Sequence, residues 1–202
     1  MDREQGCVMD GEERKSLEAR YGPFPLVQVD LAMEPSSVKF YRKAFKSRRG
    51  EILFVLRRPS GDLLLHTKHS YPSGLFRIPG GGIDWGEPVP ESLRREVREE
   101  TQFDVDCERL LGVLQYRFHS RESQPAEADV HFISFVFEVP GVEGEPVPED
   151  QSEGISGFKW IPPAELVRVA VVLRSLPNDE RGRGDWGRFR AIGHDFVSQQ
   201  LG

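Results

Sequence analysis

The stretch that decides the fold is GGIDWGEPVPESLRREVREETQF, which runs from Gly81 to Phe103 of the 202-residue chain. It opens with glycines and ends in a run of charged residues interrupted by single apolar ones. The part from Pro88 to Gln102 predicts a helix, because proline is tolerated in a first turn. Leu93 and Val97, four residues apart, would face the core. The pattern indicates a glycine-rich loop followed by an amphipathic helix.

Three carboxylates share one face of this predicted helix. Glu96 and Glu100 are one turn apart, and Glu99 lies on the neighbouring edge. Like charges at this spacing destabilise a helix by roughly 0.2–0.5 kcal/mol per pair, so a compensating cation is expected. Mg²⁺ or Mn²⁺ is the natural candidate, because hard cations prefer oxygen ligands. The alternative is a solvated, charge-rich helix, which is what such runs usually are when taken alone.

Neighbouring residues extend this candidate site. Arg95 precedes Glu99 by four residues, so it can pair with that carboxylate and fix its direction. Glu87, at the mouth of the loop, is expected to orient the arginine or the loop rather than to bind metal. The loop glycines are Gly80, Gly81 and Gly82. They allow a sharp turn and a close approach to a ligand, and their carbonyls can serve as metal ligands.

The stretch resembles the Nudix box, the loop–helix signature of Nudix hydrolases. The matching positions are Gly81, Glu87, Arg95, Glu96, Val97, Glu99, Glu100 and Phe103. Gln102 is the one departure, since the family usually has glycine there. A left-handed residue is favoured at that helix end, so we expect glutamine to alter the exit of the helix more than the metal site. The resemblance extends over about residues 49–173.

This resemblance implies a fold, an activity and a set of roles. The implied fold is an α/β/α sandwich with a mixed β-sheet. The implied activity is Mg²⁺- or Mn²⁺-dependent hydrolysis of a phosphoanhydride in a nucleoside diphosphate linked to another group, by water attack on phosphorus. The implied metal ligands are Gly80, Glu96, Glu99 and Glu100. Arg95 would orient Glu99, and Glu87 would support the loop.

The general base is left open by the resemblance. Glu96 or Glu99 can serve from the helix, or an acid can act from the loop before GFKWIP. Glu153 is the best placed of the loop acids, seven residues before Trp160, and a solvated loop charge is its alternative.

Substrate contacts are expected from residues beside the glycine loop. Arg77, just before that loop, is a candidate for binding phosphate together with Gly81 and Gly82; a surface arginine is the alternative. The basic segment 39–50 is either a phosphate-facing patch or a solvated face. Aromatic residues can stack on a base or fill the core, and the core is favoured for Trp85, Tyr116 and Phe118.

The order of predicted elements places this site within one domain. We expect an N-terminal extension over residues 1–48, partly flexible or strand-forming, a Nudix domain over 49–173 and a C-terminal helical extension over 174–202. Strands do not alternate regularly with helices, which argues against a doubly wound parallel sheet and favours a mixed-sheet sandwich. A hairpin is predicted around Pro59–Asp62. Strands are predicted within 103–120, 129–141 and 157–162, a loop over 141–157, and helices over 163–173 and 186–201.

Composition and charge limit the classes of partner that the chain is expected to bind. The net charge is −6 and 30% of the residues are charged, so electrostatic binding of nucleic acid over a broad surface is not expected. The polar start is unlike a signal peptide, and no apolar run approaches a membrane span. Cys7 and Cys107 lack metal-ligand spacing and predict free thiols in a reducing, cytoplasmic setting. The expected partner is a small nucleoside-diphosphate derivative. The first 48 residues could form a homodimer by strand exchange or could cap the site.

Two other functions compete with the hydrolase. A Nudix-like domain can sense a nucleotide without cutting it, but such proteins often lose the box glutamates, which are all present here. An isomerase-type relative would need further catalytic residues that the sequence does not identify.

Overall fold

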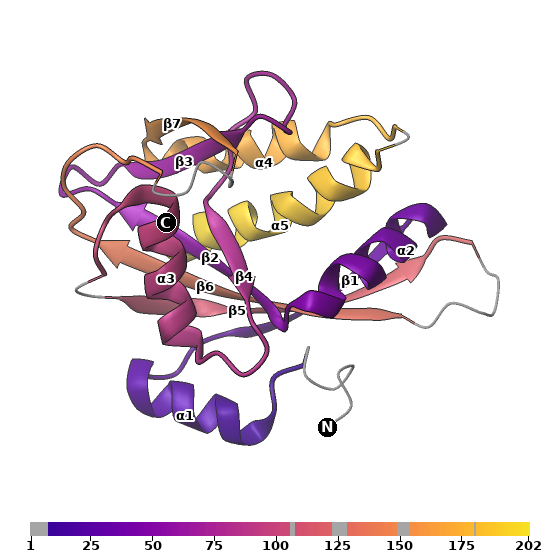
Figure 1. The fold of residues 1–202 in the computed structure, drawn as a ribbon, viewed down its shortest axis with the longest axis horizontal. Coiled ribbons are helices and arrows are strands. Elements are labelled where there is room, and N and C mark those ends of the chain that lie inside the picture. Colours follow the sequence, from indigo (N-terminus) through magenta and orange to yellow (C-terminus); the bar gives the residue numbers. More distant parts are fainter. Residues whose placement is uncertain (1–7, 106–107, 123–128, 149–153, 180) are drawn as a thin grey trace.

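The computed structural model describes residues 8–105, 108–122, 129–148, 154–179 and 181–202. These form one mixed sheet in the order β1-β5-β6-β2-β3-β7, with β4 paired to β2 (Figure 1). The strands are β1 Leu26–Met33, β2 Gly50–Arg57, β3 Leu63–Lys68, β4 Gly80–Ile83, β5 Arg109–Ser120, β6 Val130–Pro140 and β7 Ile155–Ile161. The helices are α1 Gly11–Tyr21, α2 Pro35–Ala44, α3 Val89–Thr101, α4 Leu166–Arg174 and α5 Arg183–Leu201, with 3₁₀ turns η2 Phe45–Ser47 and η4 Pro163–Glu165.

Side chains of the central strand β2 alternate between two apolar layers, as a strand buried on both faces requires. Ile52 and Phe54 pack in the layer that contains α3 and Leu17 of α1. Leu53 and Val55 pack in the layer that contains α2, α4 and α5. β1–β5 and β2–β6 are parallel, whereas the other paired strands are antiparallel. The predicted α/β/α sandwich with a mixed sheet is therefore confirmed.

Most predicted elements are present with small shifts at their ends. The hairpin joins β2 to β3 with Arg57 opposite Leu63, and the predicted box helix is α3. β7 begins at Ile155, inside the segment predicted as a loop, and α5 begins three residues before the predicted start. The first 48 residues contain α1, β1 and α2, and β1 lies beside β5 of the same chain over eight residue pairs.

The exit of α3 lies at Gln102. Gln102 adopts a left-handed conformation with φ of 59°, and its N–H donates to the Arg98 carbonyl. This is the conformation that glycine favours at a helix end. Glutamine therefore bears the steric strain of this conformation, and the expected change in the helix exit stays a prediction.

Among the described residues, no helix combines the length and apolar character needed to cross a membrane.

Candidate active site

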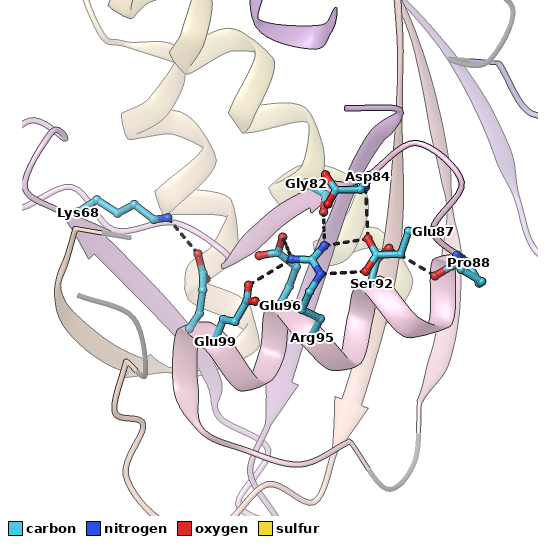
Figure 2. A network of polar contacts seen from close by, with 10 residues as sticks. Lys68, Gly82, Asp84, Glu87, Pro88, Ser92, Arg95, Glu96 and Glu99 are labelled. Carbon is cyan, nitrogen blue, oxygen red and sulfur yellow. Dashed lines mark hydrogen bonds and ion pairs between the residues drawn. The ribbon is translucent and has the colours of Figure 1, made fainter. Parts of the chain in front are cut away.

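Arg95 is the centre of the polar network on α3 (Figure 2). Its Nε and Nη2 each donate to one carboxylate oxygen of Glu87 at 2.8 Å, and Nη2 also donates to the Gly82 carbonyl at 2.9 Å. Its Nη1 lies 2.8 Å from Glu96 and 3.1 Å from Glu99. The hydrogen bonds from Arg95 lower the pKa of Glu87 to about 2. The Arg95 guanidinium thus links three carboxylates to β4, the strand that contains Gly80, Gly81 and Gly82 and is called the glycine strand below.

Glu96 is packed against the backbone of the glycine strand. A Cβ added to Gly81 would lie 1.7 Å from Oε2 of Glu96, so only glycine permits this approach. The side chain of Glu96 is 8% exposed. Burial raises its pKa to about 7, the negative charges of Glu100 and Glu99 add to this rise, and Arg95 opposes it. Glu96 therefore sits where a further positive charge would be stabilising.

Two carbonyls of β4, those of Gly80 and Gly82, face away from β2. The Phe54 N–H donates to the Pro79 carbonyl at 3.2 Å, and residue pairs in an antiparallel ladder alternate in hydrogen bonding. Gly80, the next residue, therefore turns its carbonyl away from β2. Gly82 does the same, since its carbonyl accepts from Arg95.

Glu100 occupies a different environment from the other two carboxylates. It is fully buried, with Oε1 3.0 Å from Lys68 Nζ and Oε2 3.1 Å from His66 Nδ1. Burial alone would raise the pKa of Glu100, but its contacts with His66 and Lys68 outweigh burial and lower it. Burial also lowers the pKa of His66 to about 4, which leaves the imidazole neutral at pH 7. Glu100 is thus a charged carboxylate with an internal cation beside it.

The three carboxylates are not assembled as a closed metal site. Within the described part of the chain, no group of three His, Cys, Asp or Glu side chains is placed to hold a metal ion. Glu96 and Glu99 share Arg95, whereas Glu100 faces Lys68. The oxygen donors that fit a hard divalent cation are the carboxylates of Glu96 and Glu99 and the Gly80 carbonyl. The predicted ligand role of Glu100 stays a prediction.

A cavity of about 330 Å³ opens beside this network. Its cationic lining residues are Arg48, Lys68, Arg77, Arg95 and Arg190. Its acidic lining residues are Glu51, Asp84 and Glu96. With five cations against three acids, and with the Gly80–Gly82 backbone forming part of the wall, the cavity suits an anionic ligand near a carboxylate-bound cation.

Two residues that sequence reasoning did not select form a buried ion pair in this wall. Glu51 of β2 accepts from Ser134 Oγ at 2.7 Å and from Arg190 Nη1 at 2.6 Å. Arg190 comes from α5, 139 positions further along the chain. Its basic character carried no spacing signal, because only the packing of α5 on the sheet brings it to the cavity.

His194 is a second contribution of α5 to the site. Its Nε2 accepts the Ile78 N–H at 2.9 Å, so its Nδ1 carries the proton donated to the Arg190 carbonyl at 2.9 Å. Burial lowers the pKa of His194 to about 3, which keeps the ring neutral. The histidine therefore fixes the backbone at Ile78, two residues before β4; the glycines predicted as a loop form this strand.

Arg77 and Arg48 both reach the cavity. Arg77 is buried, lines the cavity and donates from Nε to the Tyr71 hydroxyl at 2.6 Å. Arg48, from the basic segment, also lines the cavity, whereas Lys39 and Lys43 of the same segment lie outside it. In the basic segment 39–50, Arg48 therefore lines the cavity, whereas Lys39 and Lys43 belong to a solvated face.

Other predicted residues lie away from the cavity. Tyr116 and Phe118 belong to the apolar core, as their favoured interpretation predicted. The favoured core interpretation is wrong for Trp85, which is partly exposed, belongs to none of the apolar clusters and donates from Nε1 to the Lys46 carbonyl. Glu153 falls outside the described residues, as does Cys107.

Comparisons with known proteins give one family match and several relatives. The family model described as NUDIX domain matches residues 47–181. An ADP-ribose pyrophosphatase of Methanocaldococcus jannaschii is 33% identical over 91 residues, which are 45% of this chain and 50% of that protein. A Nudix hydrolase of Deinococcus radiodurans is 25% identical over 147 residues, 72% of this chain and 76% of that one.

Likeness to solved structures is weaker. The E. coli dihydroneopterin triphosphate pyrophosphohydrolase is 18% identical, with a TM-score of 0.47, over 72% of this chain and 97% of that chain. The chain spans 50% of the length of the Methanocaldococcus jannaschii protein and 38% of the length of a putative ADP-ribose pyrophosphatase of Bacillus subtilis, which is 30% identical over 83 residues.

Proposed function

Because the chain belongs to the NUDIX domain family, we propose that it hydrolyses the phosphoanhydride of a nucleoside diphosphate linked to another group, by attack of water on phosphorus. The observation that carries this proposal is the network around Arg95. One guanidinium holds Glu87, Glu96 and Glu99 beside the glycine strand, at the wall of a cavity rich in cationic side chains. This combination offers carboxylates for a cation and cations for phosphate oxygens.

The proposed cofactor is Mg²⁺ or Mn²⁺. Glu96, Glu99, Glu100 and the Gly80 carbonyl would hold it, with Glu100 placed beside Lys68. When bound, such a cation neutralises charge on phosphate oxygens and makes a water molecule more acidic. The raised pKa of Glu96 supports this proposal, because a nearby cation would favour the ionised form of that carboxyl.

The remaining steps fall to side chains of the chain itself. Arg48, Arg77 and Arg190, which line the cavity, bind phosphate oxygens and orient the anhydride in this proposal. Arg95 keeps Glu96 and Glu99 in position, and Glu87 keeps Arg95 in position. The group that accepts the proton of the attacking water in this proposal is Glu96 or Glu99 of the helix, or Glu153 of the segment before β7.

The substrate class is tested with a panel of phosphoanhydrides. Two relatives are named as ADP-ribose pyrophosphatases, one of them putative, and another as a putative 8-oxo-dGTP diphosphatase. The panel therefore combines ADP-ribose, nucleotide sugars, dinucleoside polyphosphates and nucleoside triphosphates. Phosphate release after phosphatase coupling is measured with Mg²⁺, with Mn²⁺ and with EDTA. We expect metal-dependent turnover of at least one nucleoside diphosphate derivative. Tight binding of one compound without turnover of any would instead favour the nucleotide-sensing function.

A further inference from the structure

A second cavity, of about 430 Å³, lies outside the network described above. It is formed where the connection between β3 and β4 meets α2 and the start of α5, two helices that pack in the same layer (Figure 1). Its aromatic lining residues are Phe40, Tyr41, Tyr71 and Trp186. Four aromatic rings around one cavity of this size suit a flat ligand ring.

The aromatic lining combines fixed and accessible rings. Tyr41 is buried in the core, and the rings of Tyr71 and Trp186 lie 5.2 Å apart between centroids. Phe40 contacts Tyr41 and is 64% exposed, so much of its ring is open to a ligand in the cavity. The ring of Phe40 therefore offers a surface for stacking at the cavity that the folded protein leaves exposed.

Ser37 provides an independent sign of a missing ligand group. It lines the cavity, is only 5% exposed, and its Oγ has no hydrogen-bond partner among the described residues. Leaving a buried hydroxyl unpaired is destabilising, so such atoms call for a specific explanation. Because this oxygen is closed off from solvent, the Ser37 hydroxyl must rotate about its Cα–Cβ bond to reach a bound ring, whose polar edge would then supply the missing hydrogen bond.

The charge of the cavity favours a ligand that also carries phosphate. Arg181 and Arg183 both line it, and Arg183 is already paired with Asp179 at 3.4 Å. The first turns of α2 and α5 also contribute lining residues, and helix N-termini favour negative charge. A ring with an attached phosphate thus fits better than an uncharged aromatic compound.

The two cavities share one wall. Tyr71 lines the aromatic cavity and its hydroxyl accepts from Nε of Arg77, which lines the cavity beside Glu96. We propose that the aromatic cavity binds the nucleobase of a nucleotide, stacked on Phe40 and hydrogen-bonded to Ser37. The nucleotide is either the nucleoside half of the substrate or a separately bound nucleoside phosphate. The substrate assignment rests on the proposed function, whereas nucleotide binding itself does not.

Equilibrium binding tests the site without requiring turnover. AMP, GMP, CMP and UMP are titrated into the full-length protein, with calorimetry as the readout. Phe40→Ala should weaken the best-bound nucleotide about tenfold, because losing a stacked ring has roughly that effect. Ser37→Ala should weaken it several-fold without loss of folding. Val171→Ala, which truncates an exposed apolar side chain of α4 outside both cavities, is the matched control and should bind as the unchanged protein does.

Kinetics then distinguish the two sources of the nucleobase. If the base belongs to the substrate, the nucleotide inhibits competitively, and Phe40→Ala raises KM with little change in kcat. The base-free anhydride 5-phosphoribosyl diphosphate should then be hydrolysed equally by both proteins. If the nucleotide binds separately, Phe40→Ala weakens its binding while KM stays unchanged.

The proposal is overturned if none of the four nucleotides binds at millimolar concentration, or if both variants bind them undiminished. Absence of turnover, with Phe40-dependent binding retained, would overturn only the proposed function.

Discussion

The backbone of Gly81 lies so close to the carboxylate of Glu96 that a Cβ built on the glycine would be 1.7 Å from Oε2. Gly81→Ala should therefore displace either Glu96 or β4. We expect kcat/KM on the substrate identified in the panel to fall by about 100-fold, since small misplacements in an active site have such effects. The variant should remain folded, as judged by circular dichroism and thermal unfolding.

Gly157→Ala is the matched control for that substitution. Gly157 is also a strand glycine, but the atom nearest to its added Cβ is Thr67 Cγ2 at 3.6 Å, an ordinary contact. The Gly157→Ala variant should have the same kcat/KM as the unchanged protein. Full activity of Gly81→Ala would show that the close approach to Glu96 has no part in the reaction.

Glu100→Gln separates a structural role from a functional one. Removing the charge leaves Lys68 facing a neutral side chain, so the free energy of unfolding should fall by about 2 kcal/mol. Turnover should be abolished, because Glu100 is one of the proposed metal ligands. The double variant Glu100→Gln/Lys68→Met should regain part of the stability in urea unfolding but none of the activity. Recovery of activity in the double variant would assign Glu100 to structure alone.

His194 should make the protein sensitive to acid. The folded state keeps this ring neutral down to a pKa of about 3, whereas an unfolded histidine takes up a proton near its ordinary pKa of 6.5. The unfolded state thus binds more protons between these values. The stability associated with His194 is complete above pH 6.5 and is lost as the pH falls toward 3.

The change His194→Gln removes this proton uptake. Below about pH 6, the free energy of unfolding of the unchanged protein should fall more steeply than that of the variant, by up to about 1.4 kcal/mol per pH unit. Urea unfolding at several pH values provides the two slopes. Parallel slopes would contradict a neutral, buried His194.

The left-handed conformation of Gln102 predicts a stabilising substitution. Gln102→Gly should relieve the steric strain at the end of α3 and raise the free energy of unfolding by about 1 kcal/mol. Gln199→Gly, at an exposed position of the regular helix α5, is the control and should be neutral or destabilising. Denaturant midpoints with unchanged m-values measure both. Equal losses in the two variants would show that Gln102 carries no strain.

The parts of the fold that can be predicted from the sequence are those encoded in local spacing. The interval between Glu87 and Arg95, and the single apolar Val97 between charged residues, indicate both the loop and the helix. The hairpin is predictable for the same reason, since its turn residues lie between two apolar runs.

The remaining features depend on contacts between distant parts of the chain. β1 pairs with β5 far along the sequence, and Arg190 meets Glu51 across 139 positions. His194 carries no signal in its spacing because its partner is the backbone of Ile78, which any residue except proline could supply. Glu100 shows the opposite difficulty: its position in the box predicts a ligand, whereas its surroundings pair it with Lys68.

The most direct test of the proposed hydrolase is Glu96→Gln compared with Glu91→Gln. Both substitutions neutralise a carboxylate of α3, but Glu91 is exposed in the first turn and lies outside the cavity. With saturating Mg²⁺, we predict that kcat falls by about 100-fold or more for Glu96→Gln and stays unchanged for Glu91→Gln. Activity of Glu96→Gln within about twofold of the unchanged protein would contradict the assignment of the site.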